Sequence, residues 1–146
     1  MAKKKGAPRK LEPDQLWDLF QRYVKHVKSN PFKVHDFIGR EGRPDYREKE
    51  KPLIFEGFEL FVWENSDFKS GLQDHFANRD GRYQDFTPVC ENIRRAIRND
   101  QISGGFSGIY NASITARVAG LVERSEVNVV KEQPLFDLGG DEKSPE

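Results

Sequence analysis

Several residue types and motifs are scarce or missing in this sequence of 146 residues. It has one cysteine, Cys90, so no disulfide can form within the chain, and its three scattered histidines do not have the spacing of a zinc site. No apolar run approaches the ~18 residues of a membrane-spanning helix, and the N-terminus lacks the apolar stretch of a signal peptide. The Walker A, GxSxG and HExxH patterns are also absent. We therefore expect no metal, no cofactor and no enzymatic activity.

The composition is that of a folded chain with little apolar material. Hydrophobic residues make up 36% and charged residues 33%, while eleven phenylalanines argue against disorder. Such a chain either exposes much of its surface or completes its burial against copies of itself. Because the net charge is zero, any contact with nucleic acid must depend on local charge.

The first eleven residues, 1–11, are basic and neither periodic nor apolar, so we expect a flexible arm. A solubilising terminus and a grip on a phosphate backbone are both compatible with this composition. The predicted DNA contacts in this arm are Lys3, Lys4, Lys5, Arg9 and Lys10.

Residues 13–29 give the clearest helical pattern. Pro13 suits the first helical position, and the dipeptide at residues 30–31, Asn-Pro, ends the helix. The apolar stripe is formed by Leu16, Phe20, Val24 and Val27 with Trp17 and Tyr23 beside it, and the solvent face by Lys25, His26 and Lys28.

The next two segments differ in character. Residues 32–51 mix charges of both signs with turn residues, which indicates a solvated loop or a loose hairpin. Residues 53–76 predict two helices around a polar turn, with Ser66 as N-cap of the second, which is a helix-turn-helix outline. Interspersed aspartates make its second helix poorly suited to reading bases. The candidate DNA-contacting residues of this region are Lys69, Arg79 and Arg82.

A further helix is predicted from Thr87, taken as N-cap, with Pro88 at the first helical position. Its polar face carries Arg94, Arg95 and Arg98. Solvent exposure or ion pairing explains this face more simply than binding to nucleic acid.

In residues 99–121, the spacing of the apolar residues favours a helix, whereas the glycines disfavour one. Apolar residues recur there at helical spacing, yet three glycines fall within the run, and each costs about 1 kcal/mol relative to alanine inside a helix. We interpret the small residues at 103–108 as a surface for close packing against a neighbouring subunit; a kink at the paired glycines is the alternative. The predicted oligomerisation residues are Gly104, Gly105, Phe106, Gly108, Ile114, Val118 and Leu121.

A short strand is predicted where Val127 and Val129 alternate with polar residues. A single strand cannot satisfy its own backbone, so we expect Val127 and Val129 to pair with the same strand of other copies in a closed barrel. The tail at 139–146 is polar and acidic.

Three segments together resemble a known family. They read PDQLWDLFQRYVKHVKSNPF, EKPLIFEGFELFV and QISGGFSGIYNASITARVAGL, and they resemble the small terminase subunits of tailed bacteriophages over residues 13–138. The last segment is the most specific, because its order is close to the family block F-x-G-A, then N-x-x-I-x-A-R-x-L-G-L. The residues that carry it are Ser103, Gly104, Gly105, Phe106, Asn111, Ile114, Ala116, Arg117, Gly120 and Leu121.

The resemblance implies a ring-shaped homo-oligomer of about eight to ten subunits by analogy with the family. Such a ring binds double-stranded viral DNA and delivers it to the large terminase subunit, which carries the ATPase and the nuclease, in the host cell cytoplasm during virion assembly. The small subunit has no catalytic centre, cofactor or membrane contact of its own.

The sequence departs from the family at two places. Some relatives end in a basic tail implicated in DNA binding, whereas this chain carries Asp141, Glu142 and Glu146 there and has its positive charge at the N-terminus. The acidic segment is instead a candidate docking strip for the large subunit. The dipeptide Val118-Ala119 also replaces the more usual acidic residue and leucine.

We thus expect a mainly α fold: a helical body with a helix-turn-helix-like N-terminal part, a central helical hairpin and a short C-terminal strand that forms an inter-subunit barrel in a ring. Two alternatives are a dimeric helix-turn-helix transcriptional regulator and, with no carboxylate spacing to support it, an enzyme. The predicted parts are the arm 1–11, the helical region 12–85, the hairpin and oligomerisation core 86–122, the strand 123–138 and the acidic tail 139–146.

Overall fold

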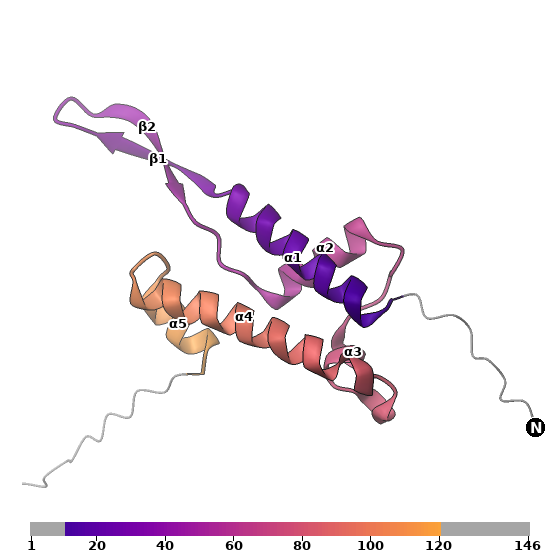
Figure 1. Cartoon of the computed structure of the whole chain (residues 1–146). Coiled ribbons are helices and arrows are strands. Elements are labelled where there is room, and N and C mark those ends of the chain that lie inside the picture. Colours follow the sequence, from indigo (N-terminus) through magenta and orange to yellow (C-terminus); the bar gives the residue numbers. More distant parts are fainter. Residues whose placement is uncertain (1–10, 121–146) are drawn as a thin grey trace, which may run out of the picture.

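The computed structural model describes residues 11–120 and is mainly helical, as predicted, with one two-stranded antiparallel sheet (Figure 1). The predicted strand 123–138, the acidic tail and most of the basic arm lie outside the described residues. The elements are α1 Pro13–Ser29, β1 Phe32–Ile38, β2 Arg43–Lys49, α2 Phe55–Asn65, α3 Gln73–Phe76, two 3-10 turns at Arg79–Gly81 and Gln84–Phe86, α4 Thr87–Phe106 and α5 Ala112–Val118.

Helix α1 confirms the clearest sequence pattern. Glu12 and Gln15 form a capping box around Pro13, so the first amide groups of the helix find partners. The predicted stripe faces inward: Leu16, Phe20 and Val27 are buried, and Tyr23 is buried beside them. Lys28, predicted on the solvent face, is half-buried instead, because an acidic group from α4 meets it there.

The core lies between α1, α2 and α4 and is closed at one end by α3 (Figure 1). Phe20 of α1 meets Phe58 of α2 edge to face, with ring centroids 5.2 Å apart. Phe58, Phe86 and Ile93 have essentially no exposed surface. Each such side chain contributes about 1.5–3 kcal/mol through burial, so this small cluster dominates the stability of the helical body.

The second helix of the predicted helix-turn-helix outline does not form as expected. Helix α2 ends at Asn65, as predicted, but Ser66 is not an N-cap: its hydroxyl donates to the carbonyl of Val62 and closes the end of α2. Only four residues, Gln73–Phe76, form α3. The reason is local, since the amide of Leu72 donates to the Glu59 carboxylate at 2.8 Å rather than to a preceding turn of helix.

Of the two forms that the sequence left open for this region, the structure shows the hairpin, formed by residues 32–49. Strands β1 and β2 pair along seven residues, from Phe32 opposite Lys49 to Ile38 opposite Arg43. Gly39 and Gly42 have φ values of +84° and +62° in the connecting turn, a conformation that glycine adopts without strain. The hairpin projects away from the helical body, beyond the end of α1 (Figure 1).

The segment with the glycines forms a helical hairpin of α4 and α5. Helix α4 begins at Thr87, so this residue is the first helical residue and not the N-cap. It runs through both Gly104 and Gly105 to Phe106. Helix α5 begins after Asn111, whose side chain accepts a hydrogen bond from the amide of Ile114 at 3.1 Å.

Candidate nucleic-acid and assembly surfaces

The three predicted DNA-contacting residues of the central region are already engaged within the chain. The Lys69 ammonium contacts the backbone carbonyl of Trp63 and lies over its ring. Arg79 pairs with Asp74 at 3.1 Å and Arg82 with Asp80 at 2.8 Å. Surface ion pairs of this kind are weak, so a phosphate can displace them, but each aspartate cancels much of the local positive charge. The structure thus places Arg79 and Arg82 beside α3 and Lys69 against α2, and aspartates offset the charge of both arginines.

The five basic residues of the arm, Lys3, Lys4, Lys5, Arg9 and Lys10, lie outside the described residues, as do Leu121, Val127 and Val129 of the predicted assembly surface. The described part begins with Leu11, which is buried in the core. The described part of the chain thus begins beside the N-terminus of α1.

The paired glycines of α4 allow the chain to pack closely against itself. A Cβ atom at Gly104 would lie 2.1 Å from the ring of Tyr110, and one at Gly105 would lie 2.7 Å from Cγ2 of Thr115 in α5. Gly108 has φ of +74° in the turn between the helices. Close packing explains both glycines, but the partner is not the neighbouring subunit that the sequence interpretation named: Gly104 and Gly105 pack against Tyr110 and Thr115 of the same chain.

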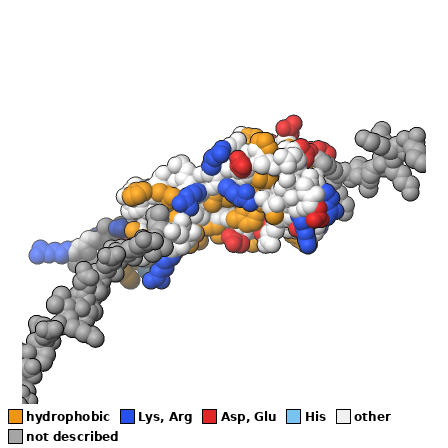
Figure 2. Space-filling model, turned by 90° about the horizontal axis from the view of Figure 1, so that it is seen from below, with side chains coloured by type: hydrophobic (Ala, Val, Ile, Leu, Met, Phe, Trp, Pro, Cys, Tyr) orange, Lys and Arg blue, Asp and Glu red, His pale blue; other side chains and the backbone are white. Residues whose placement is uncertain are grey.

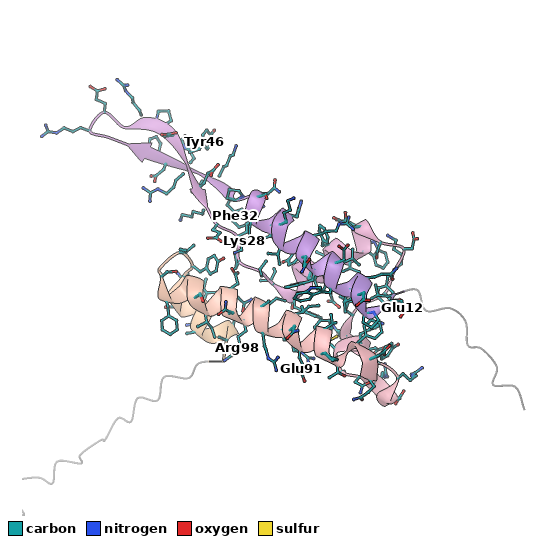
Figure 3. All side chains as sticks on the ribbon, viewed as in Figure 1. Glu12, Lys28, Phe32, Tyr46, Glu91 and Arg98 are labelled. Carbon is teal, nitrogen blue, oxygen red and sulfur yellow. The ribbon has the colours of Figure 1, made fainter. Side chains whose placement is uncertain are left out.

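A polar cluster fastens this helical hairpin to α1. The Lys28 ammonium contacts Asp100 at 2.5 Å, Tyr110 at 2.8 Å and Glu50 at 2.8 Å (Figure 3). Burial alone would lower the pKa of Lys28, but the hydrogen bonds to Asp100, Glu50 and Tyr110 outweigh it, and the pKa is raised. The second oxygen of Asp100 accepts from the amide of Leu53 at 2.8 Å. Periodicity and local motifs do not indicate this cluster, because its members are far apart in the chain.

The outer surface of the helical hairpin carries large apolar side chains. Phe106 is 84% exposed, Ile109 52%, Ile114 61% and Val118 64%; we refer to these four residues as the α4–α5 surface. Ile114 and Val118 are one turn apart and line an apolar pocket of about 250 Å³ together with Pro52 and Ile54. Three predicted oligomerisation residues, Phe106, Ile114 and Val118, are therefore available to a partner.

The β-hairpin presents a second exposed apolar surface, which the sequence analysis missed. His35 lies between Phe37 and Tyr46 on one face, with ring centroids 5.1 Å and 5.4 Å away. Phe37 is 68% exposed and Tyr46 66%. Residues 32–35 alternate between apolar and polar side chains, which has the period of a strand, but Phe37 lies on the face opposite Phe32 and Val34, so this pattern indicates a strand and not this surface.

Two side chains of types that are often reactive, a histidine and a cysteine, are buried in the core. His75 is packed among the rings of Phe68, Tyr83 and Phe86. Burial raises the pKa of the Cys90 thiol to about 11, although the nearby Arg94 lowers it, so the thiol stays protonated and unreactive near neutral pH.

Across residues 11–120, no group of three or more His, Cys, Asp and Glu side chains is placed to hold a metal ion. None of the helices in that range is both long enough and apolar enough to cross a membrane. A scan of protein-family models finds no match to the chain, and no curated protein matches its sequence.

Proposed function

We propose that this chain is the small terminase subunit of a tailed bacteriophage. In this proposal it forms a non-enzymatic ring that binds viral genomic DNA and delivers it to the large terminase subunit for packaging into the capsid. The observation that carries the proposal is the α4–α5 surface, because the segment with the most specific resemblance to the family, residues 103–121, is also the one that exposes large apolar side chains.

Exposed apolar area of this kind favours association with another protein surface. The chain has little apolar material, and the four residues of the α4–α5 surface are each more than half exposed. A head-to-tail contact between identical subunits covers such a surface on every copy when the rotation closes into a ring. In the proposal, the strand around Val127 and Val129 then adds to the same assembly as an inter-subunit barrel.

DNA binding is assigned mainly to the basic arm. Each arm neutralises a few phosphates, and a ring that presents several arms multiplies their modest affinities. Lys69, Arg79 and Arg82 make a smaller contribution, because their charges are partly cancelled within the chain. The acidic C-terminal segment is repelled by phosphate and is not assigned to DNA binding.

Native mass spectrometry of the unaltered chain tests the ring, together with two matched variants. Ile114→Asp introduces a charge on the α4–α5 surface, and Leu60→Asp introduces the same charge at an equally exposed position of α2, since their side chains are 61% and 64% exposed. We expect a closed oligomer for the unaltered chain and for Leu60→Asp, and smaller species for Ile114→Asp. A stable monomer of the unaltered chain at micromolar concentration would refute the proposal.

DNA binding is tested by the salt dependence of affinity for duplex DNA. Each phosphate contact contributes about 0.9 to the slope of log K against log salt concentration. Replacing Lys3, Lys4 and Lys5 by glutamine therefore lowers the slope by up to about 2.7 per arm. Arg79→Gln with Arg82→Gln is the control and changes the slope less. Equal slopes for the arm variant and the unaltered chain contradict the assignment.

The alternative of a dimeric transcriptional regulator is not favoured by any observation of the helical body. A recognition helix needs enough length to place several side chains in a major groove, whereas α3 has four residues. A two-fold complex on a palindromic site would support this alternative over the ring.

A further inference from the structure

A groove with an apolar floor and two arginines lies between α3, α4 and α5. Its volume is about 530 Å³, and its floor includes Phe76, Ile97 and Val118. Arg94 and Arg98, one turn apart on α4, form its basic side. Figure 2 views the molecule from the side of α4 and α5 and shows basic and hydrophobic side chains next to one another on that face.

These two arginines differ from most other arginines of the helical body. Arg79, Arg82 and Arg95 each pair with a carboxylate. Arg94 instead donates to the backbone carbonyl of Phe76 at 2.7 Å, and Arg98 to that of Ala119 at 3.0 Å; neither has a carboxylate in ion-pair contact within residues 11–120.

A neutral carbonyl holds a guanidinium in place without cancelling its charge. Arg94 is held further by its position over the ring of Phe76, 5.1 Å from the centroid. A guanidinium has five N–H donors, so both arginines keep donors for an anionic ligand. Because they are already positioned, less side-chain entropy is lost when a ligand binds.

The two arginines and the apolar floor together favour one chemical class of ligand. Two fixed, uncompensated arginines bind carboxylates or phosphates, whereas the apolar floor binds aliphatic or aromatic side chains. A DNA backbone provides phosphates but nothing for the floor. A short peptide that has carboxylates and large apolar residues satisfies both parts of the groove.

The geometry points to residues 134–142 of this chain, PLFDLGGDE, as the occupant of the groove. This segment combines Leu135, Phe136 and Leu138 with three carboxylates and has no basic residue. The last described residues, Ala119 and Gly120, lie at the groove, since Ala119 is part of its lining. This inference requires neither ring formation nor DNA binding.

The chain is long enough for the segment to return to the groove. Leu135 lies fifteen positions after Gly120, and a chain of that length spans at most about 50 Å when extended. The entropic cost of closing such a loop rises only slowly with its length, and a short tether gives an effective concentration of about millimolar. The predicted strand around Val127 and Val129 precedes Pro134, so strand pairing and docking involve different residues.

Photo-crosslinking in the full-length chain tests the inference. Benzoylphenylalanine replaces Phe136, equal amounts of ¹⁵N-labelled and unlabelled protein are mixed, and crosslinked peptides are identified by mass spectrometry. We expect adducts on peptides of α3, α4 and α5 that line the groove, with both peptides from one isotopic form. Adducts elsewhere on the body overturn the proposal. Mixed-isotope adducts in the groove also overturn it, because they show that the segment of a second copy occupies the groove.

Two pairs of variants test the charge complementarity. Asp137→Asn with Asp141→Asn and Glu142→Gln should lower the adduct yield at least five-fold, whereas Lys143→Gln, directly after the segment, should not. Arg94→Gln with Arg98→Gln should give the same loss, and Arg79→Gln with Arg82→Gln should not. Since the segment's substitutions lie outside the helical body, their effect cannot come from its unfolding. Unchanged yields in these variants, or a loss of DNA binding alone in Arg94→Gln with Arg98→Gln, refute the docked segment.

Discussion

The two halves of α4 face different surroundings. The first half buries Cys90, Ile93 and Ile97 against α1, α2 and the segment around α3. The second half packs through glycines against the chain that follows it and ends at Phe106, which is 84% exposed. One continuous helix thus belongs to a closed core at one end and to an open apolar surface at the other. The comparison suggests that the first half determines the stability of the chain and the second half its association.

The largest expected effect comes from the core end. Ile93 is fully buried, so Ile93→Ala removes apolar contacts and leaves a cavity. We expect a loss of about 2–5 kcal/mol in the free energy of unfolding, measured by urea denaturation. Ala96 is only partly buried on the same helix, and Ala96→Ser serves as the control with a much smaller change. A loss below about 1 kcal/mol for Ile93→Ala would contradict the division of α4 into two halves.

The next effect concerns the polar cluster that fastens α4 and the turn after it to α1. Lys28→Met leaves Asp100, whose side chain is 17% exposed, without its cation. We expect the free energy of unfolding to fall by about 2–4 kcal/mol. This is less than for a fully buried ion pair, because water still reaches the cluster. Lys25→Met on the exposed face is the matched control. Equal stabilities of the two variants would show that the cluster contributes little.

The same cluster has a defined dependence on pH. The pKa of Lys28 is raised in the folded chain. Its contribution to stability is therefore complete below its ordinary pKa of about 10.5 and is lost as the pH rises above that value. The difference in stability between Lys28→Met and the unaltered chain should be constant from pH 7 to 9 and should decrease above pH 10.5 in urea titrations.

The sequence predicted those parts of the fold that have a strong local pattern. The stripe of α1 and the position of α4 follow from periodicity, capping and proline. Phe68, Leu72 and Phe76 also have helical spacing, yet only the last lies in α3, because a turn closed by Glu59 brings all three to the core. Spacing alone does not distinguish these two solutions.

Tertiary contacts between residues far apart in the chain could not be predicted from the sequence. The half-buried state of Lys28 depends on Asp100, which is 72 residues away. The groove arginines were recognised as one face of a helix, but the carbonyls that hold them come from α3 and from the end of α5. Periodicity identifies a face and does not identify what lies opposite it.

The smallest expected change in the free energy of unfolding comes from a Gly→Ala variant in the second half of α4. It is informative because this substitution usually stabilises a helix, whereas we expect a loss of stability here. In an open helix, Gly→Ala stabilises by up to about 1 kcal/mol. At Gly105 the new methyl group would lie 2.7 Å from Cγ2 of Thr115, so we expect Gly105→Ala to destabilise by about 1 kcal/mol, measured by urea denaturation. Thr115→Ala removes Cγ2, the closest of the colliding atoms, and the double variant should therefore be more stable than Gly105→Ala alone. If Gly105→Ala stabilises the chain in the presence of Thr115, α5 does not pack on α4 as described, and the glycines then require a partner outside the chain.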